Sequence, residues 1–306
     1  MRKLIITMLV SVLTAMLVQA GSAAVGPPCL VSTERSGPPA RSLQAGIDAA
    51  AAGDTLIVKG TCIGTATITK DLTLRGVSSG PFVATLDGNG VGPVLSVTGT
   101  VVVAIDNLLV TNGTTGIAES FGGTLTVSHS TVSGNSGRGV FVHQDSTLTL
   151  NNSTVSANED GGIASDNGSI LTLNGSTVSG NTSSGAAGIF AYNGGGGTVT
   201  LNNSTVSGNT ATGPGGGMFF YYGTVTLNDS TINGNTAIEG NGGGVADIDG
   251  DAFILNGTST VNDNVAGLNG GGIYVVKLFY GTLVNCISGV NVAGNSPDNI
   301  FVHLYP

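Results

Sequence analysis

The chain has 306 residues, in which nine Lys and Arg residues are outnumbered by 18 Asp and Glu residues, so the formal net charge is −9 at pH 7. Because binding to nucleic acid requires clustered basic side chains that neutralise phosphates, this balance argues against a nucleic-acid partner. Only 9% of the residues are charged although the mean hydropathy is +0.32, so Asn, Ser, Thr and Gly must supply most of the polar surface.

Residues 1–24 are predicted to be a signal peptide. Arg2 and Lys3 precede an apolar stretch from Leu4 to Val18, which is shorter than the roughly 20 residues that cross a bilayer. Small residues suited to signal peptidase follow it. Since the sequence contains no second apolar run of membrane length, we expect a secreted mature chain, extracellular or periplasmic, without a membrane span.

Residues 25–54 are predicted to be an N-terminal segment containing a short helix over residues 42–52. Ser42 suits the N-cap, and Gly53 suits the position after the last turn. This helix would cover the open end of the domain that follows.

The chain has three cysteines, at positions 29, 62 and 286. Export permits disulfide formation, and Cys29 and Cys62 both lie in the N-terminal region. We therefore predict that these two pair, which leaves Cys286 as the odd thiol.

Residues 55–306 are predicted to form one repeat domain. An apolar residue followed three positions later by Asn recurs along it, in the pairs Leu109/Asn112, Val132/Asn135, Val155/Asn158, Val178/Asn181, Val206/Asn209, Ile232/Asn235, Val261/Asn264 and Val292/Asn295. Each repeat begins with an alternating strand, continues with a strand such as STVSGN, and ends with an apolar residue after a Gly-rich turn. The apolar residues of this third strand are Ile117, Val140, Ile163, Ile189, Met218, Val245 and Ile273.

Three short strands in a repeat of about 23 residues are too few for a propeller blade, and no segment has a helical period. The pattern predicts an all-β, three-faced parallel β-solenoid in which equivalent side chains stack from coil to coil. The Asn column would then be one corner ladder. A second ladder is predicted at Asn151, Asn174, Asn202, Asn228, Asn256 and Asn285.

The STVSGN repeats with their GGI turns, and the entry SLQAGIDAAAAGDTLIVKGTC with TITKDLTLRGV, resemble secreted bacterial right-handed parallel β-helix proteins of the pectate-lyase-like superfamily. The repeats are also similar to those of chlamydial polymorphic outer-membrane proteins. The resemblance covers nearly all of the mature chain. It implies the fold but no single activity, because lyases, hydrolases, esterases and adhesins share this architecture.

Two enzymatic alternatives are open. A polysaccharide lyase would need basic residues, and the only mixed cluster is Arg138 near His143 and Asp145. A glycoside hydrolase would need two carboxylates roughly 5–10 Å apart. Glu119, Asp145, Asp166 and Asp247 follow the third strands of their repeats and would meet this condition if they shared one edge, although acids are also common in solvated turns. The motifs of the known β-helix lyases and polygalacturonases are absent from the sequence.

The motif DIDGD places Asp247, Asp249 and Asp251 at alternate positions around a glycine. Such an arrangement resembles the start of a Ca²⁺-binding loop, in which carboxylate oxygens converge on the ion. The alternatives are a tentative Ca²⁺ site and a solvated turn. No other cofactor is expected.

Six aromatic residues are predicted to lie on one outer face, because they follow the third-strand apolar positions by one or three residues. They are Phe141, Phe190, Tyr192, Phe219, Tyr221 and Tyr274. Exposed apolar strips commonly mark interaction sites, and aromatic rings stack on the C–H faces of sugars. The alternatives are a Gly-rich loop, such as residues 210–217, that folds over the strip, or a shift of parity that turns some rings inward.

A second outer face carries a column of Thr residues, at positions 126, 149, 172, 200 and 226. Such columns occur on ice-binding solenoids, and also on β-solenoids generally because Thr favours exposed strand positions. The sequence therefore favours an exported β-solenoid that binds a polysaccharide or cell-surface glycan through the aromatic face, with a polysaccharide lyase or glycoside hydrolase as the alternative.

Overall fold

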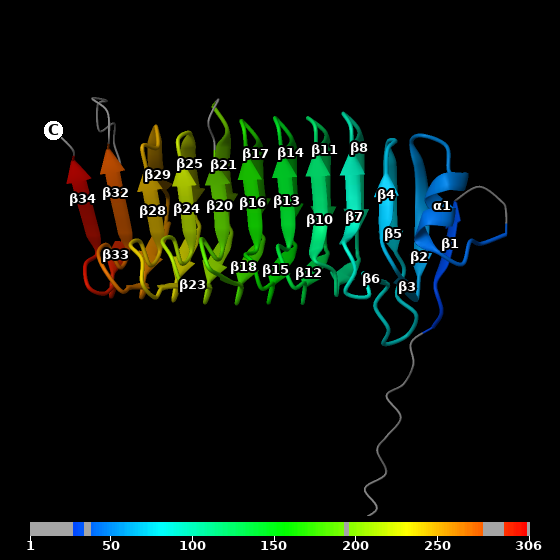
Figure 1. Ribbon diagram of the computed structural model, residues 1–306, viewed down its shortest axis with the longest axis horizontal. Helices are drawn as coiled ribbons and strands as arrows, with labels where there is room; N and C mark the ends of the chain where they lie inside the picture. The colour runs from blue at the N-terminus through cyan, green and yellow to red at the C-terminus, as the bar shows by residue number, and fades with distance from the viewer. Residues whose placement is uncertain (1–26, 34–37, 193–195, 278–290, 305–306) are drawn as a thin grey trace, which may run out of the picture.

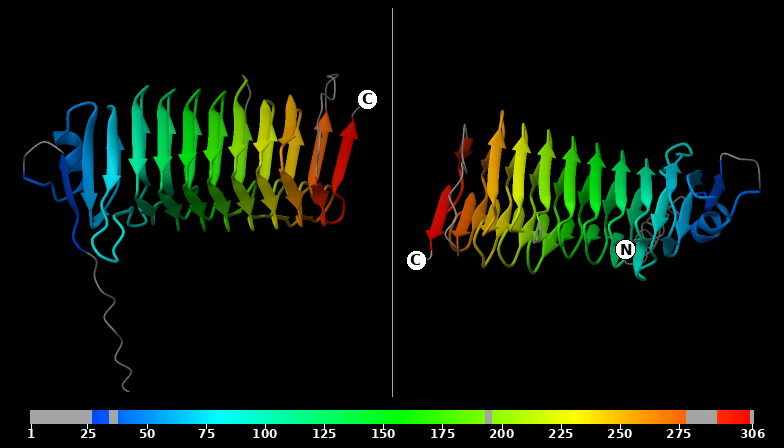
Figure 2. Two further views of the ribbon diagram at one scale, coloured as in Figure 1. Left: turned by 180° about the vertical axis from the view of Figure 1, so that it is seen from behind. Right: turned by 90° about the horizontal axis from the view of Figure 1, so that it is seen from above.

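The computed structural model describes residues 27–33, 38–192, 196–277 and 291–304. The predicted signal peptide, Cys286 and Asn285 lie outside the described residues. Figures 1 and 2 show one elongated right-handed parallel β-helix, whose coils stack along the long axis. Three long sheets, called sheets I, II and III, form the faces of the solenoid. Along the chain, each coil passes through sheet I, then sheet III, then sheet II.

Sheet I is parallel except for its first pair, in which β1 runs antiparallel to β2. In the order of pairing it contains β1 (Leu30–Thr33), β2 (Asp54–Lys59), β5 (Leu72–Gly76), β8 (Val102–Asp106), β11 (Thr124–Ser128), β14 (Thr147–Asn151), β17 (Ile170–Asn174), β21 (Thr198–Asn202), β25 (Thr224–Asn228) and β29 (Ala252–Asn256).

Sheet II is parallel throughout. It contains β4 (Ala66–Ile68), β7 (Pro93–Thr98), β10 (Thr115–Ser120), β13 (Val140–His143), β16 (Ile163–Asp166), β20 (Ile189–Tyr192), β24 (Met218–Tyr221), β28 (Val245–Ile248), β32 (Ile273–Lys277) and β34 (Ile300–Leu304).

Sheet III is built from three-residue strands. They are β3 (Thr61–Ile63), β6 (Thr85–Asp87), β9 (Leu109–Thr111), β12 (Thr131–Ser133), β15 (Thr154–Ser156), β18 (Thr177–Ser179), β22 (Thr205–Ser207), β26 (Thr231–Asn233), β30 (Thr260–Asn262) and β33 (Asn291–Ala293).

A small fourth sheet explains the drift in repeat length. It contains β19 (Thr182–Ser183), β23 (Thr210–Ala211), β27 (Thr236–Ala237) and β31 (Val265–Ala266). These strands lie in the connection from sheet III to sheet II, which grows longer from residue 182 onwards. The extra residues therefore widen one corner and leave the three long sheets in register.

The interior is a stack of apolar columns. In sheet I, one column runs through Leu125, Leu148, Leu171, Val199 and Val225, which pair directly from strand to strand and are fully buried. Burying one such side chain contributes roughly 1.5–3 kcal/mol relative to leaving it exposed. Because strand residues alternate in direction, the intervening Thr residues point outward.

The inner Asn ladder closes the corner after sheet III, as predicted. From Asn135 to Asn295, each side-chain amide donates to the Oδ1 atom of the Asn one coil later, at 2.9–3.1 Å. The same Oδ1 atoms accept the backbone N–H of the preceding Asn. The buried corner is thereby satisfied without water.

The prediction that Asn112 begins this ladder is wrong. Val110, rather than Leu109, pairs with Val132, so the ladder position belongs to Gly113, whose N–H donates to Asn135 Oδ1 at 3.0 Å. Asn112 lies one position early and is exposed, and its side chain donates to Asp87 Oδ1 at 2.7 Å. A shift of one residue in register moves a side chain to the other face.

Two further ladders follow sheet I. The outer Asn ladder joins Asn151, Asn174, Asn202, Asn228 and Asn256 at 2.7–2.9 Å and is partly exposed. Next to it lies a Ser ladder that the sequence analysis missed, in which each hydroxyl accepts the backbone N–H of the Ser in the preceding coil. It runs through Ser130, Ser153, Ser176, Ser204, Ser230 and Ser259. These buried Ser residues satisfy the second corner of each coil.

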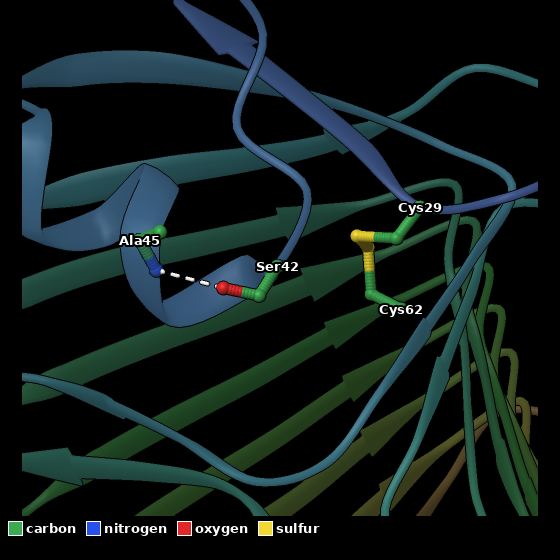
Figure 3. Close-up of a disulfide and its surroundings, with 4 residues drawn as sticks. All are labelled: Cys29, Ser42, Ala45 and Cys62. Atoms are coloured by element: carbon green, nitrogen blue, oxygen red, sulfur yellow. Dashed lines mark hydrogen bonds between the residues drawn. A yellow bond between two sulfur atoms is a disulfide. The ribbon is translucent and has the colours of Figure 1, made fainter.

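The helix α1 (Leu43–Ala49) covers the N-terminal end of the solenoid, as Figure 1 shows, and is shorter than predicted because Ala50 already has extended backbone angles. Ser42 is the N-cap and accepts the Ala45 N–H (Figure 3). Gln44 both donates to and accepts from the backbone of Thr67. The helix therefore supplies hydrogen bonds to the outer edge of β4, whose other edge pairs with β7.

The predicted disulfide is confirmed, because Cys29 is bonded to Cys62. Figure 3 shows this bond beside the helix. It joins the residue before β1 to the first strand of sheet III and so fastens the N-terminal segment to the first coil.

Candidate functional site

The aromatic strip, defined as the six predicted residues, lies on the outer face of sheet II. Its members come from β13, β20, β24 and β32, and all are partly or fully exposed. Tyr192 has the largest exposed fraction, 40%. The neighbouring Phe220 points into the core and is fully buried, so the alternation predicted from the sequence is confirmed.

The parallel register stacks the rings of neighbouring coils. The rings of Phe190 and Phe219 lie 5.7 Å apart and nearly parallel, at 6°. Those of Tyr192 and Tyr221 are 5.5 Å apart at 14°. These four residues form one continuous, partly exposed aromatic patch on two strands, with two phenol hydroxyls at one side.

Two further aromatic residues extend the strip. Phe301 of β34 pairs with Tyr274, and their rings stack at 5.7 Å. Tyr222 follows β24 and meets Tyr221 edge to face at 4.4 Å. Phe301 could not be found from its distance to a Gly-rich turn, because no glycine directly precedes its strand. Tyr222 lies in a turn with a positive φ of 62°, beyond the strand alternation that was used for the prediction.

Gly-rich turns pack against the base of the strip but leave it accessible. Gly215, with φ of 74°, lies so close to Phe219 that a Cβ atom would be 2.5 Å from the Cβ of Phe219. Phe219 nevertheless stays partly exposed. The 210–217 segment therefore does not cover the rings of the strip, and that alternative is wrong.

A cavity of about 310 Å³ opens where the strip is interrupted. On β16 the residue between Phe141 and Phe190 is Ala164, so one ring is missing from the column. In addition, the turn over residues 182–188 is longer than the turn over residues 159–162 in the coil before it. The longer turn projects beyond the shorter one, and the pocket lies between its residues 183–186 and Ala164.

The pocket has charged walls. Arg138 and Asp160 line it together with Phe190 and the serines at 183 and 184. The Arg138 guanidinium lies 5.0 Å from the centre of the Phe141 ring, and its Nε atom lies 4.0 Å from Asp160 Oδ2. Ser183 donates to Asp160 Oδ1 at 3.3 Å. The sequence analysis placed Arg138 near His143 and Asp145 and missed its partner, since Asp160 belongs to the next coil.

The carboxylates proposed for glycoside hydrolysis do not share an edge. Glu119 and Asp247 occupy the inward column of sheet II and are buried, with exposed fractions of 0% and 1%. Asp166 faces outward and is hydrogen-bonded to His143, while Asp145 lies in an exposed turn. The basis of the hydrolase alternative is therefore wrong, because strand alternation sends these acids to opposite sides of the sheet.

Glu119 is an acid whose pKa its surroundings change. Burial raises the pKa of its carboxyl above the ordinary value, although hydrogen bonds from Ser146 and the Gly123 amide and the charge of His143 lower it. It lies inside the solenoid, so it can stabilise or destabilise the coil but cannot meet a substrate chain on the outer face.

The proposed Ca²⁺ ligands do not converge. Asp247 points into the core and accepts the Gly250 N–H at 2.8 Å, whereas Asp251 is exposed. No group of three His, Cys, Asp or Glu residues in the described ranges could hold a metal ion. The reason is that the strand ends before the motif does: Asp247 still belongs to β28, which ends at Ile248, while Asp249 lies in the turn after it, with φ of 52°.

Comparison with known proteins supports the fold. No curated protein and no solved structure matches the chain significantly. No helix within the described residues has the length and apolarity needed to cross a membrane. The family model described as "Right handed beta helix region" matches residues 83–226. This range contains strands of all three long sheets. The chain therefore has the fold of a right-handed parallel β-helix.

Proposed function

We propose that this β-helix protein is secreted and binds a polysaccharide or cell-surface glycan through the aromatic strip. The observation that carries this proposal is the stack of partly exposed rings at Phe190 and Phe219 and at Tyr192 and Tyr221. Such rings offer flat faces to sugar C–H bonds, and the phenol hydroxyls offer hydrogen bonds at the edge. The resemblance of the repeats to secreted proteins of the pectate-lyase-like superfamily supports export, but it implies no single activity.

The rigidity of the scaffold also favours binding. Each ring stands on a parallel strand fixed by its neighbours in register, and the inner Asn ladder fixes the corner between sheet III and sheet II. A ligand therefore pays little for ordering the protein side of the contact. The coils repeat at about 4.7–4.9 Å, so an extended chain of similar units can make the same contact on successive strands.

A glycan array with the mature chain tests the proposal. We expect Phe219→Ala and Tyr221→Ala each to weaken binding about tenfold, because loss of one stacking ring removes about 1.4 kcal/mol. Ile170→Ala is the control, since Ile170 is 45% exposed but lies on β17 of sheet I, away from the strip. Absence of any glycan signal, or a signal that all three variants leave unchanged, would refute the strip as a binding site.

Two further measurements test the remaining parts of the proposal. Mass spectrometry of the protein recovered from periplasm and medium should show a new N-terminus near residue 25. Incubation with the glycans that bind should release no reducing sugar and no unsaturated uronate. Release of either product would favour the lyase or hydrolase alternative over a binding protein.

A further inference from the structure

The pocket at Ala164 is a polar site that touches the strip. Its floor is Ala164 and one wall is the ring of Phe190, while Arg138 and Asp160 stand at the opposite side. Its volume of about 310 Å³ is at the lower end of the roughly 300–1,000 Å³ found for small-molecule sites. A site of this size holds one ring-sized unit of a longer ligand.

The charges in the pocket are balanced. Arg138 is the cation and Asp160 the anion, and they lie 4.0 Å apart. A guanidinium donates hydrogen bonds and a carboxylate accepts them, so together they match hydroxyl groups that can do both. A ligand carboxylate or sulfate would instead meet the Asp160 carboxylate, and it would approach a chain with a net charge of −9.

The surrounding sequence also disfavours an anionic ligand. No Lys or Arg occurs between Arg138 and Lys277, so the coils that carry Phe190 and Phe219 have no basic side chain to neutralise a polyanion. His143, on the next column of the same face, is already engaged by Asp166. The strip offers aromatic rings and hydroxyls but only the one guanidinium beside the pocket.

We infer that the pocket lined by Arg138, Asp160, Ala164 and Phe190 selects an uncharged pyranose unit, and that the strip binds neutral rather than acidic glycans. This inference rests on the proposed glycan binding and adds the class of sugar. The pyranose lies with its C–H face on Phe190, and its hydroxyls meet Asp160 and Arg138. The rest of the glycan continues over the stacked rings of Phe190 and Phe219, on the C-terminal side of the pocket.

Two pairs of matched variants test the pocket. Ala164→Leu fills it, and Ala118→Leu adds the same side chain in the same outward column two strands earlier, away from the pocket. Asp160→Asn removes the carboxylate, and Glu159→Gln neutralises the adjacent exposed acid, which does not line the cavity. Asp160 is exposed on the surface, so its variant remains informative if Ala164→Leu does not fold.

Affinity is measured by calorimetry with neutral polysaccharides (β-glucan, mannan and xylan) and with polygalacturonate and alginate, at low and high salt. We expect binding to at least one neutral polysaccharide with little salt dependence. Ala164→Leu and Asp160→Asn should each weaken it at least tenfold, while Ala118→Leu and Glu159→Gln should leave it unchanged.

The outcomes separate this inference from the strip proposal. Binding that is lost with Phe219→Ala but indifferent to Ala164→Leu and Asp160→Asn would overturn the pocket and leave the strip. Preferential, salt-sensitive binding of polygalacturonate or alginate would overturn the choice of neutral sugars. No binding to any polysaccharide would overturn the proposed function, and this inference with it.

Discussion

Asn181→Ala removes one rung of the inner Asn ladder, and we expect it to lower the free energy of unfolding by about 3–5 kcal/mol. Asn181 is fully buried. Its amide donates to Asn209 Oδ1 at 2.9 Å and to the Val155 carbonyl at 3.1 Å. Its Oδ1 atom accepts the backbone and side-chain N–H groups of Asn158 at 3.0 and 2.9 Å.

The magnitude follows from the groups that lose these bonds. Each buried donor or acceptor left without a partner costs about 1–3 kcal/mol, and the truncation removes partners from Asn158, Val155 and Asn209. Asn209 Oδ1 still accepts the backbone N–H of residue 181, so its loss is partial. The main cost therefore falls on Asn158 and on the Val155 carbonyl, which lie where water cannot replace the missing amide.

Equilibrium unfolding in guanidinium chloride measures the change, with Asn174→Ala as the matched control. Asn174 belongs to the outer ladder and makes two side-chain bonds, to Asn151 and Asn202. Because this ladder is partly exposed, water replaces those bonds and we expect a loss of about 1 kcal/mol. If Asn181→Ala were no more destabilising than Asn174→Ala, the inner ladder would not be the main polar support of the corner.

Three other predictions concern stability. The raised pKa of Glu119 means that the folded state holds the carboxyl proton more tightly than the unfolded state does. The wild type should therefore lose stability relative to Glu119→Gln as the pH rises above the ordinary pKa of 4.5, and the stabilities of the two proteins should converge below it. Equal stability curves at all pH values would contradict this. Cys29→Ser with Cys62→Ser should lower the free energy of unfolding by about 2–5 kcal/mol, and a reducing agent should have the same effect on the wild type only. Gly139→Ala would place a Cβ atom 2.6–2.7 Å from Val155, Asn158 and Gly162, whereas at Gly180 that atom meets nothing and only the positive φ opposes it; the thermal midpoint should therefore fall further for Gly139→Ala than for Gly180→Ala.

The sequence alone was sufficient to predict the fold and the parity of the strip. Repeated STVSGN strands and Gly-led apolar residues set the coil, and alternation placed Phe219 outside and Phe220 inside. The same alternation, applied consistently, also puts Glu119 inside, because it lies two residues after the buried Ile117. The inward position of Glu119 is therefore also contained in the sequence.

Other features depend on the register between coils, which residue spacing does not determine by itself. The pairing of Val110 with Val132 gives the ladder position to Gly113 instead of Asn112. Similarly, Asp160 meets Arg138 because a turn of one coil lies against the turn of the next. These contacts join residues more than 20 positions apart, and a shift of one residue would have replaced each partner.

The sequence by itself therefore determined the repeat, the buried columns and the aromatic face, because each follows from local alternation or from the period of the repeats. It also determined the cap helix, through its capping residues, and the disulfide, through the two cysteines of the N-terminal region. Only the tertiary structure decided the pocket at Ala164, since that cavity arises from a difference in length between two neighbouring turns and from a missing ring between Phe141 and Phe190. A step of this kind exists only when successive coils are stacked in register.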